Sequence, residues 1–124
     1  MDSTFDKDKK IAVAGIGGVG GYLAAMLACA CPHVTVVARG ERGESIREHG
    51  IRLHSDYKGE IVSRPERVVA SSRELEPQDY IFICVKNYSL EEVCQEIRGA
   101  VREDTVVIPV MNGTDVGERV RRLL

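Results

Sequence analysis

Hydrophobic residues occur in this chain as short, strand-length runs, separated by longer stretches in which apolar positions recur with helical spacing. The apolar runs predict buried strands over about residues 10–14, 34–38, 80–85 and 105–111. The stretches between them predict helices over about residues 18–30, 44–49 and 89–101, and a last helix that begins at Thr114 or Asp115. Strands that alternate with helices are typical of a parallel sheet covered by those helices.

One segment interrupts this alternation. Residues 51–54 and 60–63 each alternate apolar and polar positions, with turn-forming residues between them, which predicts a β-hairpin. Residues 67–70 predict a third parallel strand, and Gly50 is predicted to end the helix before the hairpin. Residues 39–43 are predicted to form a loop.

The first strand runs into a glycine-rich turn that opens the first helix, with Gly15, Gly17 and Gly20 in the pattern GxGxxG. The first glycine allows a tight turn, the second lets a pyrophosphate approach the backbone, and the third lets the helix pack closely. The helix N-terminus then offers free N–H groups to the phosphates. A turn that only packs tightly is the alternative. We predict a dinucleotide site formed by Gly15, Ile16, Gly17, Gly18, Val19 and Gly20.

The glycine turn and the alternating elements together predict an α/β fold with a doubly wound, Rossmann-type, mostly parallel sheet. This topology places the strand over 80–85 beside the first strand, at the switch point. We expect residues 1–8 to be a loose tail and residues 9–124 to form the dinucleotide-binding domain. The sheet is expected to be incomplete at its C-terminal end. An uncovered apolar face on the last helix then favours a homo-oligomer.

Arg39 follows the second strand, nineteen positions after Gly20. NAD-binding chains usually carry an acidic residue near this position, to hold the ribose 2′-hydroxyl. An arginine there pairs instead with a 2′-phosphate, so the predicted cofactor is NADP(H). Arg42 can assist or compete in this role, Glu41 can reach a hydroxyl, and a solvated loop arginine is the alternative for Arg39.

Two further polar residues end buried strands, at the edge of the sheet where ligands bind. Lys86 directly follows the strand over 80–85, where it can bind a substrate carboxylate or a cofactor oxygen. A strand-end lysine in water explains its position equally well. Asn112 follows the last strand and can donate and accept hydrogen bonds, although an Asn-Gly turn explains it slightly better.

Composition narrows the functional classes. The chain has 124 residues, 44% of them hydrophobic and 29% charged, with a net charge of −2. This is the size of one domain, and nothing in it resembles a basic nucleic-acid stripe, a membrane span or a secretory signal. The four cysteines and three histidines lack metal-ligand spacing, so we expect reduced thiols, a cytoplasmic location and no metal site.

Several stretches resemble the N-terminal half of ketopantoate reductases (2-dehydropantoate 2-reductases). The matching stretches are IAVAGIGGVGGYLA, VTVVARG, IREHGIRL, DYIFICVKNYSLEEV and TVVIPVMNG. The resemblance implies hydride transfer from NADPH to the C2 ketone of the 2-oxoacid 2-dehydropantoate, in pantothenate biosynthesis. It also implies catalytic and cofactor contacts for Lys86 and Asn112, with Arg39 on the 2′-phosphate.

The family has a second, mostly helical domain, which supplies the general acid and further substrate contacts. We expect that domain to be absent here, so this chain alone should bind NADP(H) but reduce the substrate poorly or not at all. Two alternatives stay open: a non-catalytic NADP(H)-binding or sensing module, and the cofactor domain of another 2-oxoacid or hydroxyacid dehydrogenase.

Overall fold

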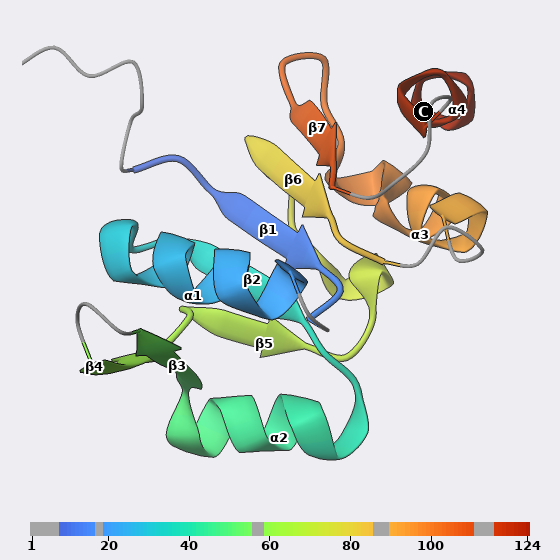
Figure 1. The fold of residues 1–124 in the computed structure, drawn as a ribbon. Coiled ribbons are helices and arrows are strands. Elements are labelled where there is room, and N and C mark those ends of the chain that lie inside the picture. The colour runs from blue at the N-terminus through green and yellow to red at the C-terminus, as the bar shows by residue number, and fades with distance from the viewer. Residues whose placement is uncertain (1–7, 17–18, 56–58, 86–89, 111–115) are drawn as a thin grey trace, which may run out of the picture.

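The computed structural model describes residues 8–16, 19–55, 59–85, 90–110 and 116–124. Five strands form one parallel sheet in the order β5-β2-β1-β6-β7 (Figure 1). Their bounds are β1 Ile11–Ala14, β2 Val34–Val37, β5 Arg67–Val69, β6 Tyr80–Ile83 and β7 Val106–Pro109. Ile11 stands in register with Val34 of β2 and with Tyr80 of β6. The doubly wound fold is therefore confirmed, with β6 beside β1 as expected.

Successive residues of β1 point to opposite faces of the sheet, and each face has its own core. Ile11 and Val13 belong to a buried cluster with residues of α1 (Val19–Ala30) and α2 (Gly40–His49). Ala12 and Ala14 belong to a second cluster, with α3 (Leu90–Ile97) and α4 (Val116–Leu123). The helices accordingly lie on both sides of the sheet (Figure 1). All four residues of β1 are at most 1% exposed, as expected of a central strand.

The predicted hairpin is confirmed as β3 (Ile51–Ser55) paired antiparallel with β4 (Gly59–Ser63). Gly50 caps the preceding helix with a φ of 77° and donates its N–H to the carbonyl of Ile46. The hairpin is tied to α1 by the buried Ser63 hydroxyl, which donates to the carbonyl of Ala25 at 2.7 Å. This bond fixes the hairpin beside the first helix.

The predicted loop over residues 39–43 is wrong, because α2 already begins at Gly40. Gly43 is buried in the first turn, and a Cβ there would lie only 2.4 Å from the carbonyl oxygen of Ala38. A glycine that suggests a loop in the sequence therefore permits a close helix contact in the fold. Arg39, in extended conformation, becomes the N-cap residue of α2.

The short 3₁₀ helix η1 (Ser72–Glu74) after β5 was not predicted, although Ser71 and Glu74 have the spacing of a capping box. It begins with a reciprocal capping box between Ser71 and Glu74. Another short 3₁₀ helix, η3 (Arg98–Ala100), follows α3. None of the helices in the described part of the chain is long and apolar enough to cross a membrane.

Candidate functional site

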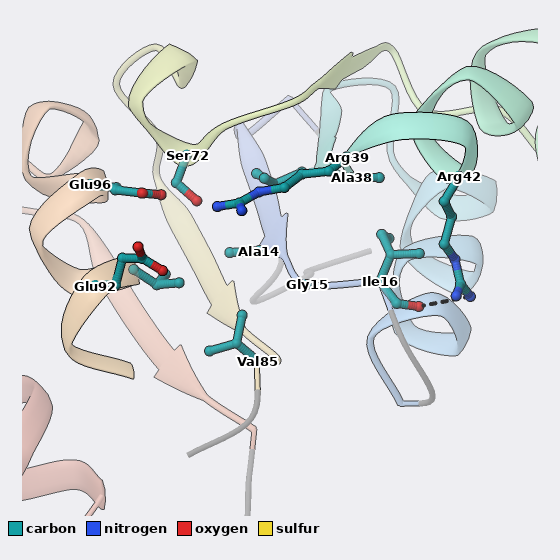
Figure 2. A pocket seen from close by; sticks show the side chains of 12 residues that line it. Ala14, Gly15, Ile16, Ala38, Arg39, Arg42, Ser72, Val85, Glu92 and Glu96 are labelled. Carbon is teal, nitrogen blue, oxygen red and sulfur yellow. Dashed lines mark hydrogen bonds between the residues drawn. The ribbon is translucent and has the colours of Figure 1, made fainter. Parts of the chain in front are cut away.

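A cavity of about 280 Å³ opens at the carboxyl ends of the central strands (Figure 2). Its residues come from the ends of β1 and β2, the turn after β5, the end of β6, and one face of α3. They are Ala14, Gly15, Ile16, Val37, Ala38, Arg39, Arg42, Ser72, Val85, Glu92, Val93 and Glu96. This edge is where doubly wound sheets bind their ligands.

The glycine turn has the conformation that its sequence pattern predicts. Gly15 has a φ of 104°, and a Cβ there would stand 2.8 Å from the carbonyl oxygen of Cys84. A Cβ at Gly20 would lie 2.0 Å from the carbonyl oxygen of Gly15, so α1 packs directly on the turn. The tight turn and the close helix packing are thus confirmed, while phosphate binding stays a prediction.

The structure describes part of the rest of the predicted phosphate site. Ile16 is buried and lines the cavity, and its carbonyl accepts a hydrogen bond from Arg42 Nη2 at 3.4 Å. Val19 is the first residue of α1. Gly17 and Gly18 lie outside the described residues.

Arg39 and Arg42 approach the cavity from two sides of the glycine turn. Arg39 extends from the end of β2 across the cavity toward Ser72, and Arg42 lies on the side of Ile16 (Figure 2). Both arginines are exposed, which leaves their guanidinium groups accessible to an anion. Glu41 is also exposed but does not line the cavity.

Cys84 lies beneath the glycine turn, in the segment that continues β6. Its backbone N–H donates to the carbonyl of Ala14 at 2.8 Å. Desolvation by burial raises the pKa of the Cys84 thiol to about 11. The thiol is therefore protonated at neutral pH, so its position is explained by packing and not by nucleophilic chemistry.

Sequence reasoning missed the outer wall of the cavity, which Ser72, Glu92 and Glu96 form. Ser72 could have been found, because it follows a parallel strand on the ligand edge. Glu92 and Glu96 are four residues apart on α3 and thus share one helix face. Nothing in the sequence shows that this face meets the end of β2.

Lys86 and Asn112, the predicted catalytic residues, lie outside the described residues. The described chain reaches Val85, which lines the cavity directly before Lys86. Their roles therefore stay predictions.

Comparison with known proteins identifies the family. The sequence profile described as ketopantoate reductase PanE/ApbA matches residues 11–124. The chain belongs to this family. Over 105 residues it is 39% identical to a 2-dehydropantoate 2-reductase of Mesorhizobium japonicum, covering 84% of this chain and 32% of that protein. The chain spans about a third of the length of the curated ketopantoate reductases that it matches.

Solved structures agree with the family assignment. A 2-dehydropantoate 2-reductase from Porphyromonas gingivalis W83 superposes with a TM-score of 0.82 at 38% identity, over 92% of this chain and 42% of that one. A D-mandelate dehydrogenase, solved with NADH and anilino(oxo)acetate, superposes with a TM-score of 0.73 at 28% identity, over 90% and 37% of the two chains. Each superposition covers at least 90% of this chain.

Proposed function

We propose that this chain is the NADP(H)-binding part of an oxidoreductase of the 2-dehydropantoate 2-reductase type. The observation that carries the proposal is the cavity at the glycine turn, with Arg39 reaching across it. When bound, the nicotinamide cofactor supplies the hydride for reduction of a 2-oxoacid at its C2 ketone. Pantothenate biosynthesis and a cytoplasmic location are the corresponding expectations for the whole protein.

The geometry of the turn fits a dinucleotide diphosphate. At Gly15 and Gly20 the space for a side chain is already occupied by backbone atoms, so only glycine fits this narrow turn. The N-terminus of α1 starts at Val19, directly after the turn, and contributes partial positive charge. Residues 15–20 would hold the diphosphate here.

The choice between NADP(H) and NAD(H) depends on the end of β2. Arg39 stands where an acidic residue would hold a 2′-hydroxyl, and its guanidinium can donate two hydrogen bonds to a 2′-phosphate. The D-mandelate dehydrogenase was solved with NADH, so this fold also occurs with the unphosphorylated cofactor. Arg39 favours NADP(H) for this chain.

Lys86 and Asn112 are proposed to contact the cofactor and the substrate. Lys86 directly follows the cavity-lining Val85, and a lysine there can bind the substrate carboxylate. Asn112 can donate to the ketone oxygen. These two contacts orient the substrate, whereas the proton donor is expected in a second domain.

A second candidate function is the cofactor domain of a hydroxyacid dehydrogenase with another substrate. The likeness to D-mandelate dehydrogenase favours it, because that protein shares the sheet. A non-catalytic NADP(H)-sensing module would use the same cavity. Substrate assays on the whole protein distinguish these candidates, whereas nucleotide binding tests what they share.

The decisive experiment is a fluorescence titration of the chain with NADPH and with NADH. Arg39→Ala should weaken NADPH binding by about ten- to a hundredfold, because a hydrogen bond between charged groups is worth about 1.5–3 kcal/mol. The exposed Arg122 on α4 provides the matched control, and Arg122→Ala should leave both affinities unchanged. Equal binding of NADPH and NADH to the unmodified chain would refute the role of Arg39, and binding of neither would refute the proposed function.

A further inference from the structure

Glu96 is a half-buried residue whose carboxylate lies on the wall of the cavity. Its side chain is only 9% exposed, although glutamate is rarely buried without a partner. Arg73 Nε lies 4.0 Å from its Oε2 atom, beyond hydrogen-bond distance. Among the described residues the carboxylate has no hydrogen-bond partner. Figure 2 shows it on the side of the cavity opposite the glycine turn.

Ser72 provides an independent observation at the same wall. The residue is 3% exposed, and its backbone carbonyl accepts from the N–H of Leu75. Its hydroxyl has no partner among the described residues, yet it lines the cavity. In Figure 2 it lies between Glu96 and the Arg39 guanidinium. The hydroxyl therefore faces the cavity, where it is free to hydrogen-bond a polar group of a ligand.

The position of this wall indicates which part of a dinucleotide reaches it. With the diphosphate on the glycine turn and the ribose at Arg39, the cavity continues toward α3 and can take the base. Ala14, Val37, Val85 and Val93 give it apolar sides that suit a flat aromatic ring. Polar groups on that wall therefore face the edge of the ring.

We infer that Glu96 and Ser72 form a subsite that reads the edge of adenine. This inference rests on the proposed cofactor site. The exocyclic amino group of adenine donates to the Glu96 carboxylate, and the Ser72 hydroxyl donates to a ring nitrogen. An ionised carboxylate only accepts hydrogen bonds, so it favours an amino group and repels a carbonyl oxygen at the same position.

The negative charge of Glu96 also limits where the 2′-phosphate can bind. Glu92 and Glu96 both line the α3 wall, and two carboxylates repel a phosphate. We therefore expect Arg39, and not the α3 wall, to bind the phosphate group.

The test compares NADPH with reduced nicotinamide hypoxanthine dinucleotide phosphate, in which an oxo group replaces the adenine amino group. The unmodified chain should bind NADPH at least about tenfold more tightly, because a site built for one hydrogen-bonding pattern is left unpaired by the other. Glu96→Gln should reduce this ratio of the two affinities to about threefold or less, since an amide can donate a hydrogen bond to the oxo group.

Glu91 provides the matched control, because it is exposed on the same helix and does not line the cavity. Glu91→Gln should leave the ratio unchanged. Ser72→Ala should weaken NADPH binding by about three- to tenfold, consistent with loss of one hydrogen bond.

The outcomes separate this inference from the proposed function. If the unmodified chain binds both nucleotides equally well, the adenine subsite is refuted, whereas the cofactor site stands. If the ratio is large but Glu96→Gln leaves it intact, Glu96 serves only to hold Arg73, and its reading role is refuted. If neither nucleotide binds, both proposals fail.

Discussion

Replacement of Gly20 by alanine tests whether the close packing of α1 on the glycine turn holds the site together. The new Cβ would lie 2.0 Å from the carbonyl oxygen of Gly15 and 3.0 Å from the Cβ of Cys84. An ordinary contact begins at 3.4 Å, so the start of α1 must move away from the turn by more than an ångström. The backbone oxygen cannot rotate away as a flexible side chain could.

The cost of this movement can be bounded. Overpacking in a well-packed core costs about 1–3 kcal/mol, and we expect the upper end because Ala24 and Ala25 anchor the same helix at 0% exposure. With an unfolding entropy of about 2.1 cal/mol/K per residue, 3 kcal/mol lowers the melting temperature of a chain of this size by about 10 °C. The displaced amides should also lose at least about tenfold in NADPH affinity.

The assay is thermal unfolding followed by circular dichroism, together with NADPH titration. Gly99 gives a matched control, because a Cβ there meets no atom within 4 Å. Gly99→Ala should shift the melting temperature by no more than about 2 °C, which is typical of surface substitutions. If Gly20→Ala melts like the Gly99→Ala control and binds NADPH normally, the contact does not hold the site, and the reasoning from the turn is refuted.

Two further predictions concern stability. The Cys84 thiol keeps its proton up to a pKa of about 11, whereas the thiol of the unfolded chain releases it near 9.0, so the unfolded state binds fewer protons between these values. The free energy of unfolding should therefore fall as pH rises from about 9 to 11, and urea titrations should show a smaller fall in Cys84→Ala. Ser63→Ala leaves the buried carbonyl of Ala25 without its 2.7 Å donor and should cost about 1–2 kcal/mol of unfolding free energy. Ser45→Ala on the exposed side of α2 should cost almost nothing, and equal losses in the two serine variants would contradict the role of this bond.

Periodicity predicted most of the fold because burial in this sheet is regular. Ile11 and Val13 face one core and Ala12 and Ala14 the other, so β1 appears in the sequence as a continuous apolar run. The turn at Gly15 was equally visible, because few residues other than glycine adopt its positive φ. These features depend on neighbours in the sequence, which a pattern can show.

The errors and omissions depend on contacts between distant segments. Gly43 suggested a loop, yet it lies in a helix. The position is a glycine because it packs against the backbone of Ala38, where a side chain would not fit. Glu96 looked like any glutamate on an amphipathic helix, and only the fold brings it to the same cavity as Arg39. Side chains that converge from separate elements carry no local signal, so the outer wall of the cavity became visible only in the structure.

Arg39 and Glu96 are proposed to bind two different groups of one nucleotide, the 2′-phosphate and adenine. Whether they act independently can be tested. Arg39 extends from the end of β2 and Glu96 from α3, with no ion pair between them among the described residues (Figure 2). Arg39→Ala should therefore reduce the preference for NADPH over NADH and leave the preference for adenine over hypoxanthine unchanged. Glu96→Gln should do the reverse, because groups without shared contacts act independently. If either variant changed both preferences alike, one common distortion of the cavity would explain them better than two distinct contacts.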